Sequence, residues 1–366
     1  MPGALEEVIQ RLLAQAAELW PGTPPQRITV TKQIQRPYSN TFRLALLPGE
    51  QAQTVHYPAA VYAKIIRPTA KNRDNTQKYV ERLQKEFEVA RLLRARLPTA
   101  REFGVVHPVA YYGDLLCLVT TEASGIVLAD VIAAGSKRWH GKNAWPNIAR
   151  HCRRAGALLA AIQVATPETQ PLRAEELLEY VEIRLQRLVA SPAVPFSEPE
   201  AAAVRKFLEK TLAHMPVEQW QQSGCHSDYA PFNLLADTAR MTVFDFAMFK
   251  TGSVYNDLAY FCHRLEGYLH KPTFSPSAIH ALQHAFLEGY SQAGPGENRG
   301  LDHDPMFCVF LIKHVVNNYS AIMRQRVAGP SAHLSLPTRL FNRRVFRRYN
   351  DWLLHICKFM DSRVRA

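Results

Sequence analysis

Three polar residues in the stretch GCHSDYAPFNLLADTARMTVFDF have the types and spacing that phosphoryl transfer requires. Asp228 precedes Asn233 by five positions, and Asp245, followed by Phe246, comes twelve positions after Asn233. Phosphoryl transfer needs a carboxylate that accepts the proton of an acceptor hydroxyl, and oxygen ligands for Mg²⁺ on the nucleotide phosphates. Asp228 is therefore the candidate catalytic base, and Asn233 and Asp245 are candidate magnesium ligands.

The sequence around these residues predicts how they come together. Two short strand-like runs, NLLAD and MTVFDFAMF, flank a turn at Asp237 to Arg240. A tight loop followed by this hairpin would bring Asp228, Asn233 and Asp245 to one mouth. Aspartate and asparagine also order turns by bonding their own backbone, so a purely local role remains the alternative.

This segment resembles the catalytic and metal-binding loops of the aminoglycoside phosphotransferase and choline kinase superfamily. The usual pattern there is His-Gly-Asp-x4-Asn, followed by Ile-Asp-Phe or Ile-Asp-Trp. The resemblance implies a two-lobed, protein-kinase-like fold, ATP and Mg²⁺ as cofactors, and transfer of the γ-phosphoryl group to a hydroxyl. In this comparison Asp228 matches the catalytic base, and Asn233 and Asp245 match the metal ligands. His226 matches the residue that shapes the loop, and Asp257, in VYNDLAYF, matches the aspartate that opens the next helix and braces the loop.

The resemblance extends upstream to the residues expected to bind the nucleotide. Lys64, in VYAK, matches the nucleotide lysine, and Glu86, in QKEFEVARLL, matches its helix partner. Ser39 and Asn40, in RPYSNTFRLAL, resemble the phosphate-covering hairpin. Glu122, at the expected lobe boundary, is the remaining nucleotide-binding candidate. Lysine and glutamate are common residues, so their order and spacing relative to the Asp228 motif carry this prediction.

Two assignments have alternatives. Glu88 competes with Glu86 for Lys64, and Glu86 is preferred because it leaves Val89, Ala90 and Leu93 as the buried stripe of the helix. Asp257 can be interpreted as a helix cap, because Asn256 and Asp257 stand just ahead of LAYF. His226 is expected to order the loop by hydrogen bonding rather than to accept a proton.

The sequence also departs from the family pattern. Ser227 replaces the usual glycine before Asp228, and the expected effect is mild because serine tolerates most backbone conformations except those with positive φ. The phosphate-covering turn contains no glycine, and Ile162-Gln163 stands where the family usually has Leu-His. None of these changes removes a group that the chemistry requires, so an active enzyme is expected.

The elements that position these residues follow from periodicity. Strand-like runs at 28–34, 41–47, 59–66, 105–113 and 115–123, with a helix from about 75 to 96, predict a small, mainly antiparallel sheet with one helix. Helical periodicity then dominates, at 146–165, 174–190, 198–214, 275–292, 305–327 and 338–360, with Asp304 and Pro305 as a helix start. The fold class is therefore α+β. The expected division is a nucleotide-binding lobe at 1–122, with a leading helix at about 4–20, and a helical lobe at 123–366 that carries the catalytic and metal loops.

Composition sets limits on compartment and partners. The six cysteines form no Cys-x-x-Cys pair, which indicates buried thiols in a reducing cytoplasm. The sequence shows no signal-peptide core and no uninterrupted apolar run of about 18 residues, so a soluble, cytoplasmic protein is expected. The formal net charge is +12, and part of it lies in the arginine-rich tail around 343–348. That tail is interpreted as an amphipathic helix that docks its aromatic side. Nucleic acid is not expected as a partner, and binding to a membrane surface is the lesser alternative.

The acceptor is expected to be a small molecule. Only FAMFKTGSVYN separates Asp245 from Asp257, which is too short for the activation segment on which a peptide lies. Lysine and arginine outnumber aspartate and glutamate in residues 250–366, which favours a neutral or anionic acceptor over a polycationic aminoglycoside. The alternatives are a nucleotide-binding scaffold and a lipid or glycolipid kinase that docks through its basic tail. The acceptor's identity, the choice between ATP and GTP, and the oligomeric state do not follow from the sequence.

Overall fold

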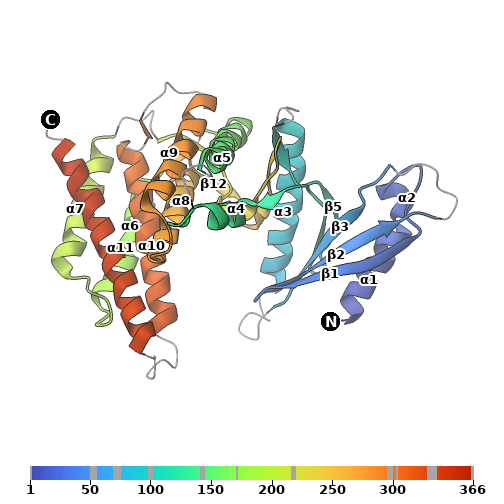
Figure 1. The fold of residues 1–366 in the computed structure, drawn as a ribbon, viewed down its shortest axis with the longest axis horizontal. Coiled ribbons are helices and arrows are strands. Elements are labelled where there is room, and N and C mark those ends of the chain that lie inside the picture. Colours follow the sequence, from blue (N-terminus) through green and yellow to red (C-terminus); the bar gives the residue numbers. More distant parts are fainter. Residues whose placement is uncertain are drawn as a thin grey trace. The chain divides into compact units, whose positions relative to one another are not determined.

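The computed structural model describes residues 2–49, 56–68, 76–97, 102–140, 145–169, 172–215, 220–294, 300–301, 304–327 and 336–363. The chain divides into two compact units (Figure 1). The first unit comprises Met1–Val127 and Asn233–Phe249, and the second comprises Leu128–Phe232 and Lys250–Ala366. The predicted α+β class is confirmed, since strands dominate the first unit and helices the second.

The first unit is built on a five-stranded antiparallel sheet with the order β1-β2-β3-β6-β5. Its strands are β1 (Arg27–Gln35), β2 (Ser39–Leu47), β3 (Ala60–Ile66), β5 (Pro108–Tyr112) and β6 (Cys117–Thr121). Buried and half-buried residues alternate along β2, as expected for a strand whose two faces meet different surroundings. The strands predicted around residues 28–34, 41–47 and 59–66 are therefore confirmed.

Helices cover both faces of this sheet. On one side lie α1 (Pro2–Ala14) and α2 (Ala16–Leu19), and on the other lies α3 (Thr76–Arg96), as Figure 1 shows. Leu12 of α1 shares a core with Val119 of β6, whereas Leu83 of α3 packs with Leu118, the preceding strand residue. Successive strand residues point to opposite faces, so the two cores lie on opposite sides of the sheet. The helix predicted at about 4–20 is interrupted at Gln15.

A second sheet explains why residues 233–249 belong to the first unit. Its order is β4-β11-β10-β7, with β4 (Phe103–Val105), β7 (Ile126–Val127), β10 (Leu234–Ala236) and β11 (Met241–Val243). The hairpin of β10 and β11 pairs with β7 on one side and, in parallel, with β4 on the other. This grouping differs from the expected division at 122/123, which placed the metal loop in the helical lobe. The run 105–113, predicted as one strand, is shared between β4 and β5, which pair with different strands.

The second unit is mainly helical. Its helices are α4 (Leu128–Gly135), α5 (Trp145–Ala165), α6 (Ala174–Val189), α7 (Glu198–Ala213), α8 (Tyr255–Glu266), α9 (Pro276–Ala293), α10 (Pro305–Val327) and α11 (Leu336–Arg363). A small sheet has the order β12-β9-β8, with β8 (Pro167–Glu168), β9 (Gln222–Cys225) and β12 (Lys250–Ser253). Short helical turns occupy η4 (Pro231–Asn233), η5 (Phe246–Met248) and η6 (Gly267–His270). The predicted helix start at Asp304 is confirmed, because its Oδ1 accepts the backbone N–H of Met306 at 2.8 Å.

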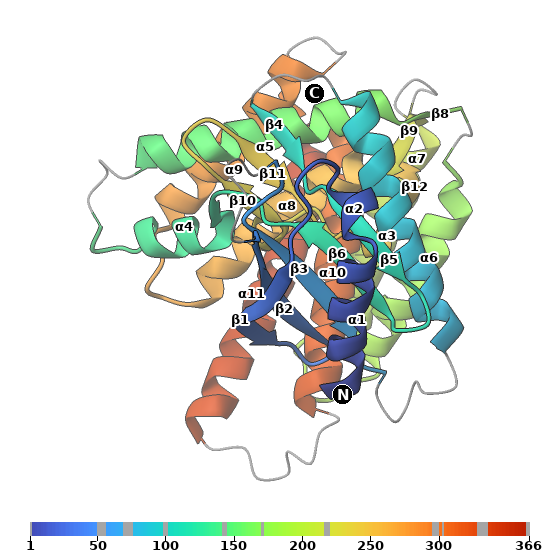
Figure 2. The ribbon, with the colours of Figure 1, turned by 90° about the vertical axis from the view of Figure 1, so that its right-hand side faces the viewer.

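Two glycines set the packing of α5 against α9, which lie side by side (Figure 2). A Cβ atom on Gly156 would lie 2.0 Å from the carbonyl oxygen of Phe286, and one on Gly289 would lie 2.0 Å from that of Arg153. The two backbones are therefore in direct contact, which only glycine permits at these positions. This contact fixes the helix on which the catalytic loop is anchored.

Helix α10 is long and apolar enough to cross a membrane by length and composition alone, but 67% of its most apolar window is buried inside the protein. That burial is typical of a core helix. No other helix within the described parts of the chain meets the same criteria. All six cysteines are buried thiols, as predicted.

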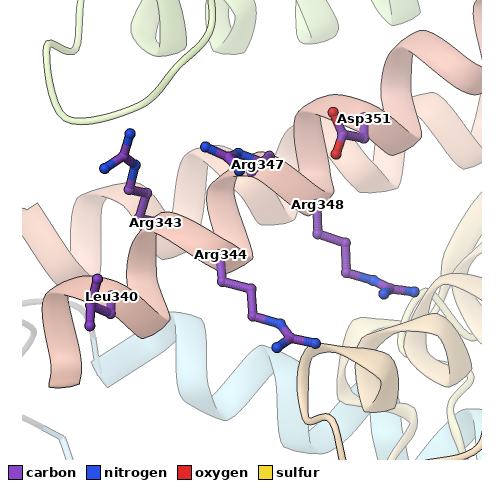
Figure 3. Close-up of a pocket in the computed structure, with 6 residues that line it drawn as sticks. All are labelled: Leu340, Arg343, Arg344, Arg347, Arg348 and Asp351. Carbon is purple, nitrogen blue, oxygen red and sulfur yellow. The ribbon is translucent and has the colours of Figure 1, made fainter.

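The C-terminal helix α11 docks through its apolar side. Val345, Phe346 and Leu353 are buried, which confirms the predicted amphipathic docking. The opposite side lines a surface pocket (Figure 3), formed by Leu340, Arg343, Arg344, Arg347, Arg348 and Asp351. In Figure 3, Arg344 and Arg348 point to one side of the helix, and Arg348 donates to Glu266 Oε1 at 2.7 Å.

Candidate active site

The catalytic loop begins at His226, and the side chain of Asp257 holds the backbone of this loop through hydrogen bonds. The Oδ2 atom of Asp257 accepts the backbone N–H of His226 at 2.6 Å, and Oδ1 accepts that of Ser227 at 2.9 Å. Burial raises the pKa of Asp257, while His226 and the two N–H groups act in the opposite direction. Interpreting Asp257 as a helix cap was wrong. Helix α8 already begins at Tyr255, and the carboxylate bonds the loop instead of its own helix.

Ser227 adopts a left-handed backbone conformation, with φ of +64°. Glycine enters this region without steric cost, whereas the Cβ of other residues is crowded there. The expectation that the Gly-to-Ser departure is mild was therefore wrong, because the loop requires the one conformation that serine tolerates poorly. The N–H bond to Asp257 holds Ser227 in this conformation.

The carboxylate of Asp228 is held by a tyrosine that sequence reasoning missed. Tyr260 Oη donates to Asp228 Oδ1 at 2.7 Å. Burial and the negative charge of Asp228 raise the pKa of Tyr260, so its hydroxyl keeps its proton and remains a donor. The signal was present in VYNDLAYF, because Tyr260 follows Asp257 by three residues and so faces the same side of α8.

Tyr229 anchors the loop to the helical core. Its side chain is fully buried, and its hydroxyl donates to the carbonyl oxygen of Ala155 on α5 at 2.7 Å. The buried ring of His226 stands edge-on to the Tyr229 ring, with 5.9 Å between centroids. The residues on both sides of Asp228 are thus fixed by the second unit, which limits the movement of the carboxylate.

The two candidate metal ligands lie at the same end of the β10–β11 hairpin, as predicted within the first unit. Leu234 pairs with Val243, and the N–H of Phe244 donates to the carbonyl oxygen of Asn233 at 3.2 Å, so Asp245 follows directly. Asp245 has φ of +69°, a left-handed conformation that few non-glycine residues adopt and that Asp adopts more often than most. One amide oxygen and one carboxylate are the hard donors that Mg²⁺ prefers. Within the described ranges, no three His, Cys, Asp or Glu residues gather into a metal cluster.

Lys64 joins the strand, the helix and the metal hairpin of the first unit. Its Nζ lies 3.1 Å from Glu86 Oε2 and 2.8 Å from Asp245 Oδ1. Burial disfavours the charge, but the two carboxylates outweigh it and raise the pKa of Lys64. The predicted choice of Glu86 over Glu88 is confirmed, since Glu86 is 5% exposed and Glu88 accepts from Gln84 instead.

The remaining nucleotide-binding candidates differ in placement. Thr41 of β2 pairs with Lys64, so Ser39, two residues away, lies on the same face of the sheet as Lys64. Asn40 alternates to the opposite face with the buried Phe42, and its predicted role in the phosphate-covering hairpin stays a prediction. Glu122 forms an ion pair with Arg43, with 2.6 Å between Glu122 Oε1 and Arg43 Nε. Arg43 lies on β2, the strand next to the one that carries Lys64.

The comparisons with known proteins agree with this geometry. A model of the phosphotransferase enzyme family matches residues 64–296, from Lys64 to beyond α9. No curated protein sequence matches the chain significantly. Among solved structures, a provisionally assigned aminoglycoside phosphotransferase from Ralstonia eutropha JMP134 has a TM-score of 0.61 at 15% identity, covering 98% of both chains.

Two further structures have the same fold. Amicoumacin kinase hAmiN, in complex with AMP-PNP, Ca²⁺ and Ami, has a TM-score of 0.53 at 16% identity, covering 95% of this chain and 93% of its own. Choline kinase from Cryptosporidium parvum Iowa II has a TM-score of 0.55 at 9% identity, covering 97% of this chain and 96% of its own. At such identities the likeness establishes the fold, and the predicted protein-kinase-like fold is confirmed.

Proposed function

The chain belongs to the phosphotransferase enzyme family, and from this premise we propose that it is an ATP-dependent kinase that phosphorylates a hydroxyl group of a small molecule. Asp228 is the proposed base, Lys64 with Glu86 binds the nucleotide, and Asn233 with Asp245 holds the metal ion. The Lys64 network is the observation that carries this proposal most directly.

In that network one ammonium group contacts two carboxylates from different elements. A lysine placed this way is held in position by Glu86 and is ready to pair with nucleotide phosphates, the arrangement that active kinases require. Ser39, on the same sheet face, would contact the phosphates as well. Asn233 and Asp245 would hold a magnesium ion, which when bound neutralises negative charge on the phosphates.

Asp228 would receive the proton in the transfer step. The acceptor oxygen forms a bond to the γ-phosphorus, the bond between that phosphorus and the bridging oxygen of ADP breaks, and the hydroxyl proton passes to Asp228. Tyr260 holds one oxygen of the Asp228 carboxylate by donating a hydrogen bond, and Asp257 fixes the backbone of the loop. These residues supply orientation, which accounts for much of catalysis in phosphoryl transfer.

The structure of the segment between Asp245 and Asp257 supports a small acceptor. Helical turn η5, strand β12 and the first turn of α8 occupy nearly all of it, and β12 pairs with β9 along its length. No stretch of irregular chain is left in which a peptide-binding activation segment could form. The same observation favours a small molecule over a protein as the acceptor.

The test is an ADP-release screen with Mg²⁺ over sugars, amino alcohols, aminoglycosides, nucleosides and sugar phosphates. With any accepted substrate, Asp228→Asn should lower kcat by about 10²-fold or more while nucleotide affinity persists. Asp245→Asn should instead weaken Mg·ATP binding, measured by calorimetry. Asp237→Asn is the matched control, because it removes the same charge from the exposed turn of the same hairpin and should leave both quantities unchanged. Turnover at the wild-type rate in purified Asp228→Asn would remove Asp228 from the mechanism.

A further inference from the structure

We propose that the acceptor already carries a phosphate monoester group, and that Arg184, Lys250 and Lys313 of the second unit bind this group. The inference rests on the proposed kinase function, for which it specifies the substrate class. We refer to these three residues as the cationic subsite. They come from α6, β12 and α10, which are far apart in sequence.

The aromatic ring of Tyr180 organises the cationic subsite. Arg184 Cζ lies 3.3 Å from the centroid of this ring, and Lys313 Nζ lies 5.7 Å from it. Asn317 Oδ1 accepts from the Tyr180 hydroxyl at 2.8 Å and from Arg184 Nε at 2.9 Å. Helices α6 and α10 lie side by side (Figure 1), so two cations are held in place between them.

The cations of this subsite lack carboxylate partners. Within the described part of the chain, Arg184, Lys250 and Lys313 form no salt bridge. Burial and then the charge of Lys250 lower the pKa of Lys313 to about 8, with a smaller contribution from Arg184, while Cys225 and Asp257 act in the opposite direction. Holding several positive side chains close together at a half-buried position is energetically unfavourable unless an anion binds to them.

A functional anion would account for that arrangement better than packing does. The surface arginines elsewhere are commonly paired, for example Arg153 with Glu288 and Arg205 with Glu182. An arginine and a lysine with a purely structural role would be stabilised by a salt bridge to an acidic side chain of this kind. The lack of a salt bridge to Arg184 and Lys313 is the state expected of a site whose acid arrives with the ligand.

The cationic subsite is connected to the catalytic loop. Lys313 Nζ donates to Asn256 Oδ1, and Asn256 Nδ2 donates to Asp257 Oδ1 at 3.3 Å. Lys250 pairs with Cys225, the residue directly before His226. All these residues belong to the second unit, which also carries Asp228. An anion held here would thus tether a substrate beside the supports of the proposed base.

The number and type of donors favour phosphate over carboxylate. Lys313 uses one of its protons on Asn256, and Arg184 uses Nε and Nη1 on Asn317 and on the carbonyl oxygen of Tyr180. Further N–H groups remain on both side chains, and Lys250 is exposed. A phosphate dianion would offset two of the three positive charges and offers three acceptor oxygens, whereas a carboxylate would offset only one.

The first experiment measures anion binding without nucleotide or metal. Inorganic phosphate and methyl phosphate should raise the melting temperature of the wild type and of Asp228→Asn, but not of Lys313→Met or Arg184→Met. Arg343→Met and Lys64→Met are matched controls, which remove one positive charge from α11 and from the nucleotide site and should keep the response. An unchanged response in Lys313→Met would overturn the proposal, as would an equal loss in Arg343→Met.

Proton uptake gives a second binding readout. An anion should raise the pKa of Lys313 again, so phosphate binding between about pH 8 and pH 10 should take up protons from the buffer. Calorimetry in buffers of different ionisation enthalpy measures this uptake, which Lys313→Met should lose. The titratable groups around Lys313 are Lys250, Arg184, Tyr180, Cys225, Asp257 and His314. Uptake that persists in Lys313→Met would assign the proton to another of them and contradict the proposal.

The activity experiment compares matched pairs, such as fructose 6-phosphate with fructose and glycerol 3-phosphate with glycerol and glycerate. The phosphate ester should have kcat/KM higher by about tenfold or more, and Lys313→Met should remove that preference without changing the KM for ATP. A preference for the neutral or carboxylate compound would overturn the proposal. So would a loss confined to Arg264→Met, which removes the cation 5.9 Å from the Tyr260 ring. Phosphate binding at Lys313 without turnover of any compound would contradict the kinase function and leave the cationic subsite standing.

Discussion

Replacing Tyr260 with phenylalanine tests the proposed base through its nearest hydrogen-bond donor. The Tyr260 hydroxyl donates to Asp228 Oδ1 at 2.7 Å and keeps its own proton, because burial and Asp228 raise the pKa of Tyr260. The hydrogen bond stabilises the ionised carboxylate relative to the neutral acid. Tyr260→Phe removes it without changing the size of the ring, so Asp228 should bind a proton more tightly.

The magnitude follows from the strength of one hydrogen bond to a charged group. Such a bond contributes about 1.5–3 kcal/mol, and 1.36 kcal/mol corresponds to about one pH unit in a titration midpoint. The acid limb of the kcat/KM profile should therefore move to higher pH by about 1–2 units in Tyr260→Phe. Activity well above that limb should fall less, because the base is ionised there in both proteins.

The assay is steady-state ADP release between about pH 4.5 and pH 9 with the best acceptor from the screen. Tyr229→Phe is the matched control, because it loses a 2.7 Å bond to the neutral carbonyl of Ala155 in the same loop. That variant should be less stable by about 1 kcal/mol and keep the acid limb in place. A lower melting temperature in Tyr260→Phe with an unmoved acid limb would show that Tyr260 only supports the fold, and the reasoning would be refuted.

Three further changes test the structure around the site. Ser227→Gly should stabilise the protein by about 0.5–1 kcal/mol in calorimetric unfolding, because relief of about 1–2 kcal/mol of left-handed strain exceeds the entropy cost of glycine. A less stable variant would contradict the left-handed conformation of Ser227. Gly156→Ala should lower stability by about 3 kcal/mol in urea unfolding because its methyl group would overlap the backbone of α9, whereas Gly267→Ala, with open space around it, should be nearly neutral. Lys64→Met should raise the KM for ATP and lower stability by leaving Glu86 buried without its partner, and adding Glu86→Gln should restore the stability but not the KM. Recovery of both quantities by Glu86→Gln would show that Lys64 does not bind ATP.

The parts of the site that the sequence predicted are those governed by local patterns. The hairpin end that carries Asn233 and Asp245 follows from two short strands and a turn, and pairing of residues 234–236 with 241–243 produces it. The choice of Glu86 follows from the buried stripe of one helix, which the structure reproduces with Val89, Ala90 and Leu93 buried. In each case the residues that decide the geometry are neighbours within one or two elements.

The parts that the sequence did not predict depend on contacts between distant residues. Arg184 and Asn317 are 133 positions apart, and no periodicity within α6 or α10 indicates that their side chains meet. The conformation of Ser227 was missed for a related reason. It is imposed by the carboxylate of Asp257, 30 positions later, which captures the Ser227 N–H instead of capping its own helix. Reasoning from the neighbours of Asp257 in the sequence therefore predicted a structural role for this residue but assigned its carboxylate to its own helix instead of the catalytic loop.

The acceptor has to be argued from charge rather than from fold. The structures similar to this chain include an amicoumacin kinase and a choline kinase, at 16% and 9% identity, so one backbone arrangement serves different acceptors. Here the second unit holds Arg184, Lys250 and Lys313, and no carboxylate forms a salt bridge with them within the described residues. Under the proposal above, a polycationic acceptor would add to this positive charge, whereas a phosphate ester would offset most of it, so electrostatics would discriminate between acceptors that the fold alone does not distinguish.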